Sequence, residues 1–69
     1  MKYAVVIEKT ATGYSGYVPD LPGIGVAGET RGEVRRLLRE AAAIYVAEKR
    51  AKGGRPPRAT TVADYVEAA

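Results

Sequence analysis

The sequence of 69 residues contains no cysteine and no histidine, and these absences remove most of the chemistry of enzymes and metal proteins. Without histidine, no side chain has an ordinary pKa suited to acid–base catalysis near neutral pH. Without either residue, the chain lacks the ligands of a zinc site and cannot form a disulfide. The acidic residues are scattered along the chain rather than gathered, so we expect no enzyme, no catalytic residue and no metal.

Long apolar runs are also missing. Five apolar residues separate Lys2 from Glu8, too few for a signal-peptide core, and nothing approaches the roughly 18 residues of a membrane span. We therefore expect a cytoplasmic protein that does not contact membranes. A single domain over residues 1–69 buries only about 60% of its unfolded surface, so we also expect a homo-oligomer, a dimer or larger.

Three strands and two turns are predicted in the first part of the chain. Residues 2–9 are apolar on both alternating faces, which is typical of a central strand. Residues 14–18 and 25–28 predict two further strands. Pro22-Gly23 suits the centre of a type II turn between them. The glycines at 23, 25 and 28 match a dinucleotide-binding pattern, but no helix begins within it, so we expect no cofactor.

A helix is predicted over residues 31–52. Thr30 and Glu33 have the spacing of a capping box at its start, and Gly53 suits its end. Apolar residues recur along one face at helical spacing. Within this stripe we expect Leu37 and Leu38 to provide most of the packing against the sheet.

The last segment is less clearly specified. Residues 62–67 favour a fourth strand, although Thr61 and Asp64 could instead cap a short helix. With the strand, the predicted fold is α+β, a single β-β-β-α-β domain. Its four-stranded, mostly antiparallel sheet has the order 3-2-1-4 and one helix on one face, with the first strand inside the sheet.

Two surfaces are candidates for binding. The proline-braced loop after the second strand could present Tyr17, Asp20 and Leu21 to a protein partner, or it could serve only as a tight turn. Arg35, Arg39 and Arg50 form a candidate basic face, which we expect to lie on the helix away from its apolar stripe. This face could bind nucleic acid or simply be solvated.

The order of these motifs resembles the HicB antitoxin family. Three runs of residues show the resemblance. They are Tyr-Ala-Val-Val-Ile-Glu near the start, then Gly-Tyr-Ser-Gly-Tyr-Val-Pro-Asp-Leu-Pro-Gly, and then Gly28-Glu-Thr30 at the start of the helix. The resemblance implies a β-β-β-α-β domain similar to part of an RNase H fold. It also implies binding to HicA, a small toxin that cleaves messenger RNA with a histidine.

Family members often carry a C-terminal DNA-binding segment, which this sequence does not show, so we expect a short stand-alone member. We therefore predict an antitoxin that neutralises a HicA-like toxin in a type II toxin–antitoxin system. The alternatives are a stand-alone nucleic-acid-binding domain and an orphan oligomeric regulatory domain.

Overall fold

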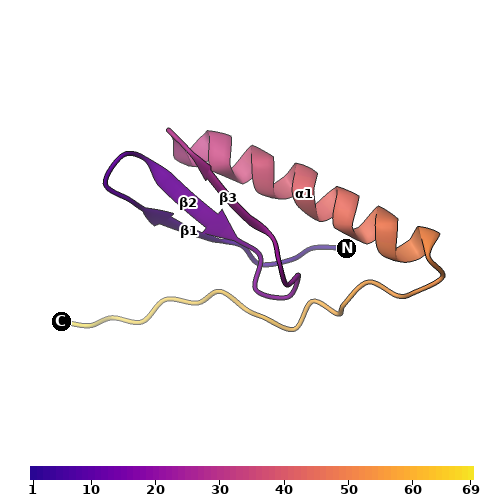
Figure 1. Cartoon of the computed structure of the whole chain (residues 1–69). Coiled ribbons are helices and arrows are strands. Elements are labelled where there is room, and N and C mark those ends of the chain that lie inside the picture. The colour runs from indigo at the N-terminus through magenta and orange to yellow at the C-terminus, as the bar shows by residue number, and fades with distance from the viewer.

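The computed structural model describes residues 1–69 and shows one helix packed across one face of a three-stranded antiparallel sheet (Figure 1). The sheet contains β1 (Val6–Lys9), β2 (Tyr14–Tyr17) and β3 (Gly25–Gly28) in the order β1-β2-β3, and α1 spans Arg31–Ala51. The three strands and the helix occur where the sequence predicts them. The first strand is shorter than predicted, because only its second half pairs with β2.

The helix approaches the sheet most closely at a glycine in the central strand. Gly16 of β2 is buried and lies between its pairing partners Ile7 and Val26. A Cβ atom at Gly16 would lie 2.8 Å from side-chain carbons of both Val34 and Leu38. The missing side chain therefore allows α1 to pack directly against the backbone of β2.

Both ends of α1 are capped as predicted. The hydroxyl of Thr30 accepts a hydrogen bond from the backbone N–H of Glu33 at 3.1 Å. The Glu33 carboxylate in turn accepts one from the backbone N–H of Glu29 at 2.7 Å. Gly53 ends the helix with a φ of 78°, a conformation that favours glycine.

The buried core is small and lies between α1 and the end of β2. It consists of four apolar residues: Val18, Leu21, Val34 and Leu38. The prediction for Leu38 is confirmed, since its side chain is completely buried. Leu37 is only half-buried, so the expectation that it shares the main packing role was wrong. Val34 has that role, because it lies one helical turn before Leu38 on the face toward the sheet.

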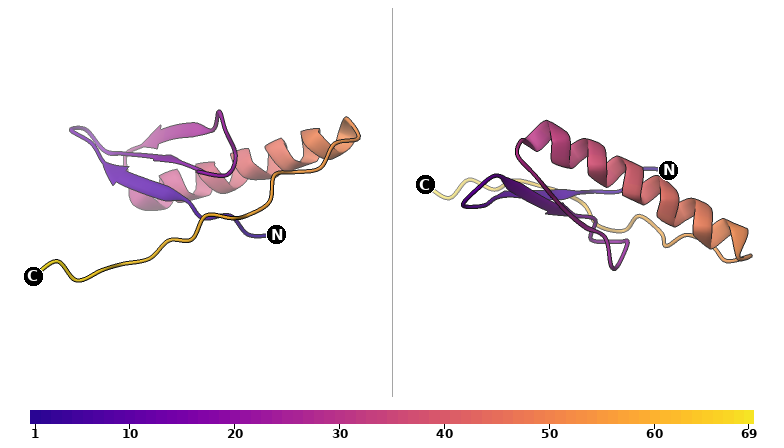
Figure 2. Two further views of the ribbon diagram at one scale, coloured as in Figure 1. Left: turned by 90° about the horizontal axis from the view of Figure 1, so that it is seen from below. Right: turned by 45° about the horizontal axis from the view of Figure 1, so that its top comes forward.

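The predicted fourth strand is absent, and residues 54–69 form neither helix nor strand. The chain returns from α1 as an extended segment and continues past the β1–β2 hairpin toward the C-terminus (Figures 1 and 2). As a result β1 lies at an edge of the sheet, where the sequence predicted an interior position. Pro56 and Pro57 cannot donate hydrogen bonds to a neighbouring strand, and the backbone N–H groups of Thr60 and Thr61 are bound by Asp20.

Candidate interaction surface

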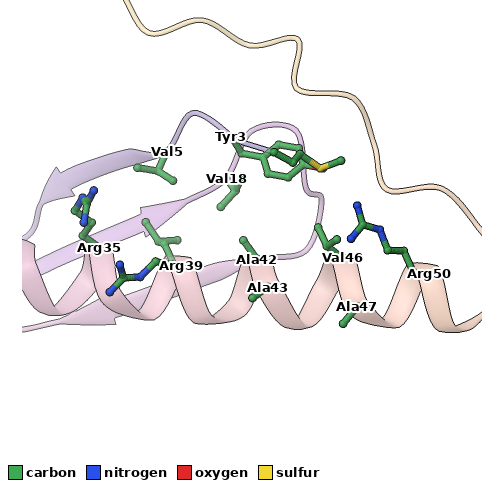
Figure 3. Close-up of a pocket in the computed structure, with 12 residues that line it drawn as sticks. Tyr3, Val5, Val18, Arg35, Arg39, Ala42, Ala43, Val46, Ala47 and Arg50 are labelled. Atoms are coloured by element: carbon green, nitrogen blue, oxygen red, sulfur yellow. The ribbon is translucent and has the colours of Figure 1, made fainter.

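A groove of about 580 Å³ lies between α1 and the N-terminal segment that leads into β1 (Figure 3). It exists because the elements differ in length. The 21 residues of α1 span about 31 Å, whereas the four residues of β2 span only about 13 Å. The second half of α1 therefore continues beyond the strands.

Apolar side chains cover the floor and walls of the groove. Nine of its twelve lining residues are hydrophobic, which suits apolar side chains of a ligand better than a polar nucleotide. The main apolar contributors are Tyr3, Val5, Val18, Leu38, Ala42 and Val46. The Tyr3 hydroxyl donates a hydrogen bond to the carbonyl of Pro57 at 2.6 Å, which brings the returning chain beside the N-terminal segment.

Three arginines also line this groove, and they correct one expectation from the sequence. Arg35, Arg39 and Arg50 border the apolar surface instead of forming a separate face away from it (Figure 3). We call these residues the arginine rim. The 3.1 Å pair between Arg36 and Glu40 is the one salt bridge in the structure, so the rim has no acidic partner within the chain. The sequence does contain a signal for this arrangement. Five of the lining residues of α1 recur at spacings of three or four and so share one side of the helix: Arg35, Arg39, Ala42, Val46 and Arg50.

The three residues of the predicted loop site, Tyr17, Asp20 and Leu21, lie in different environments in the structure. Tyr17 lies on the sheet face opposite α1 and is 45% exposed. Leu21 is 0% exposed and packs in the core, so its side chain offers no surface to a partner in this structure. The Pro22-Gly23 turn adopts the predicted geometry at Gly23, whose φ is 91°.

Asp20 binds the returning chain and accepts four hydrogen bonds. Its Oδ2 atom accepts from the backbone N–H groups of Thr60 at 3.0 Å and Thr61 at 2.9 Å. Its Oδ1 atom accepts from the hydroxyls of Thr60 at 3.3 Å and Thr61 at 2.7 Å. We call this arrangement the clamp. Sequence reasoning missed Thr60 and Thr61, because nothing in two adjacent threonines indicates which of eight acidic residues they meet.

The clamp lowers the pKa of Asp20 below its ordinary value of 3.8. The backbone N–H of Thr61 is the largest cause, followed by the Thr61 hydroxyl, and these donors outweigh the opposing effect of desolvation. Since the folded-state pKa is lowered, the stabilisation from the clamp is complete above about pH 3.8. It is lost as the pH falls further, through the folded-state pKa.

The structure does not assemble a metal centre, since no three acidic side chains come close enough to share an ion. No helix is long and apolar enough to span a membrane.

Comparison with known families gives one match, and it covers almost the whole chain. Residues 3–69 match the family model described as the HicB-like antitoxin of bacterial toxin–antitoxin systems. The matched range includes the groove, the clamp and the extended C-terminal segment. No curated protein and no solved structure matches significantly.

Proposed function

The chain belongs to the HicB-like antitoxins of bacterial toxin–antitoxin systems, and from this we propose that it neutralises a HicA-like, RNA-cleaving toxin. The family match over residues 3–69 is the observation that carries the proposal. The protein would act by binding alone, without a catalytic step of its own. The absence of histidine and cysteine from the sequence supports a non-catalytic role.

We propose that the toxin contacts the sheet face opposite α1 at Tyr17. Tyrosine often contributes strongly to protein interfaces, because a large amphipathic ring loses little conformational entropy on binding. Asp20 lies three residues further along and remains partly exposed while it holds the clamp. Its negative charge would attract a basic, RNA-binding toxin surface. Leu21 supports this region from within the core.

Nucleic-acid binding is the second candidate, because the arginine rim brings three unpaired positive charges to one groove. On α1 the surface between the arginines consists of alanine, leucine and valine side chains, which cannot stack on bases, and Tyr3 is the one aromatic residue of the groove. This arrangement favours a protein ligand. If the rim bound RNA, the affinity would fall steeply with rising salt concentration.

The test is to co-purify the protein with the small protein encoded beside it, and to measure affinity and rescue of growth. Replacing Tyr17 with alanine should weaken the complex about 30-fold, the effect of losing a contact worth about 2 kcal/mol. Ile44→Ala is the matched control, because Ile44 is 60% exposed on α1, away from the proposed contact. It should leave the affinity unchanged.

The outcomes separate the two parts of the proposal. If the intact protein forms no complex and gives no rescue, the antitoxin function is contradicted. If Tyr17→Ala binds as tightly as the parent, the toxin contacts another surface.

A further inference from the structure

The most exposed large apolar side chains of the protein lie in its C-terminal segment. Val62 is 82% exposed, Tyr65 is 93% exposed and Val66 is 91% exposed. We call residues 62–67 the arm. The arm is extended, belongs to no strand, and all of its residues are exposed. It runs past the β1–β2 hairpin to the C-terminus (Figure 2). Three large apolar residues in one extended segment are characteristic of a strand that pairs with another surface.

We propose that two copies of the chain exchange their arms, and that each arm lies in the groove of the other copy alongside β1. This inference does not depend on the toxin. It concerns how the protein assembles with itself.

The edge of β1 provides backbone partners for such an arm. β1 pairs only with β2, so the other edge of β1 has unpaired N–H and C=O groups. The segment before it, residues 1–5, also lies outside any ladder, and three of its residues line the groove. An added strand would pair this open edge and cover the apolar groove at the same time.

The arm fits the groove in length. An extended segment over residues 62–67 spans about 17 Å. The helical wall of the groove from Arg35 to Arg50 spans about 22 Å. The arm can therefore lie along the groove without extending beyond it.

The arm also complements the groove in charge. It contains Asp64 and Glu67 and no basic residue, whereas the groove is bordered by the arginine rim and lined by no acidic residue. On one face of an extended arm, Val62 and Val66 flank Asp64. With this face toward the groove, the two valines would pack on its apolar floor and the Asp64 carboxylate would lie beside the arginine rim.

The connection to the arm explains why its partner is a second copy. Pro56 and Pro57 stiffen the returning chain, and the clamp then fixes Thr60 and Thr61 at the loop after β2. From this point the arm runs past the β1–β2 hairpin of its own domain to the C-terminus, and the groove lies behind it along the chain's path (Figure 1). To enter its own groove it would have to reverse direction soon after Thr61, and no glycine or proline follows Pro57 to form that turn. A connection that cannot fold back onto its own domain favours exchange of the segment between copies.

The first test is the mass of the full chain by light scattering at about 100 μM, a concentration that detects moderate affinities. We expect twice the monomer mass of 7.3 kDa. The variant Val62→Asp/Val66→Asp should be monomeric with its helical circular dichroism intact, because both valines are exposed in the single chain. Ile44→Asp, a matched control on the solvent side of α1, should remain dimeric. A monomeric parent, or an arm variant that stays dimeric, would overturn the proposal.

A charge exchange distinguishes arms that dock in the other copy from arms that dock in their own. In the groove variant, Arg35→Glu/Arg39→Glu, an acidic arm faces an acidic groove. In the arm variant, Asp64→Lys/Glu67→Lys, a basic arm faces a basic groove. Each variant alone should dimerise at least tenfold more weakly than the parent. In an equimolar mixture both contacts are complementary, so the heterodimer should recover the parental affinity.

Docking in the same chain, or a dimer through another surface, predicts no selective recovery in the mixture. That result would refute the exchange. The toxin takes no part in either measurement, so failure here leaves the proposed antitoxin function unaffected.

Discussion

Residues 14–17 and residues 62–67 are both short, tyrosine-containing segments that the sequence predicts as strands, yet only the first forms a strand in the structure. The first forms the central strand of the sheet, with a neighbour on each side and α1 above it. The second is extended, unpaired and almost fully exposed. The difference shows that strand propensity acts only where a partner strand and an apolar layer are within reach. The clamp fixes the chain just before the second segment at the loop after β2.

The largest loss of stability is expected from removing the apolar layer above the central strand. Leu38→Ala should lower the free energy of unfolding by about 2–5 kcal/mol, because Leu38 is fully buried and its loss leaves a cavity. Urea denaturation measures the change. In the control Ile44→Ala, a 60% exposed side chain is shortened, and the change should stay within about 0.5 kcal/mol. Similar effects of both substitutions would contradict the assignment of the core.

A smaller effect is expected from adding one methyl group to the central strand itself. Gly16→Ala should cost about 1–3 kcal/mol, because the new Cβ would lie 2.8 Å from carbons of Val34 and Leu38. The matched control is Gly25→Ala in β3, where a Cβ would meet no atom within 4 Å. Thermal melting of the two variants compares them directly. If Gly16→Ala were as stable as Gly25→Ala, the close approach of α1 to β2 would be ruled out.

Releasing the clamp should have the smallest effect on global stability. Its main effect should be local, on the chain at Thr60 and Thr61 that leads into residues 62–67. Asp20→Asn removes the negative charge that accepts hydrogen bonds from Thr60 and Thr61. Amide hydrogen exchange at these two residues should become much faster, while exchange in α1 remains as in the parent. Slow exchange at Thr60 and Thr61 in the variant would show that another contact holds the chain.

Acid should produce the same release in the parent protein. Because the clamp lowers the pKa of Asp20, protection of Thr60 and Thr61 should persist down to about pH 3.8 and disappear at lower pH. The Asp20→Asn variant lacks this carboxylate and should show no such transition.

The elements of the folded body could be predicted closely from the sequence because their signals are local. Apolar alternation marks the strands, Pro22-Gly23 marks the turn, and Thr30, Glu33 and Gly53 mark the ends of the helix. Each signal involves residues within a few positions of one another, so the backbone conformation follows from short-range sterics and hydrogen bonding. The family resemblance is likewise contained in the order of these motifs.

The candidate sites were predictable only in part. The three arginines were identified, but their place beside the apolar groove depends on how far α1 extends past the strands. Tyr17 is exposed as a contact residue must be, whereas Leu21, three residues beyond Val18, packs in the core. The groove forms because a long helix packs on short strands. Periodicity alone cannot predict it, since periodicity describes one element at a time and not how two elements overlap.

The single α+β domain, its three strands, the capped helix and the buried position of Leu38 all follow from the order of the residues, as does the membership of an antitoxin family. Three features depend on how the chain folds in space: β1 lies at an edge, Asp20 binds Thr60 and Thr61 about forty positions away, and the last segment is unpaired. The two groups differ in the range of the interactions behind them. Caps and turns are satisfied by near neighbours in the chain, while a strand or a carboxylate is satisfied by whichever distant groups the folded chain brings within hydrogen-bonding distance.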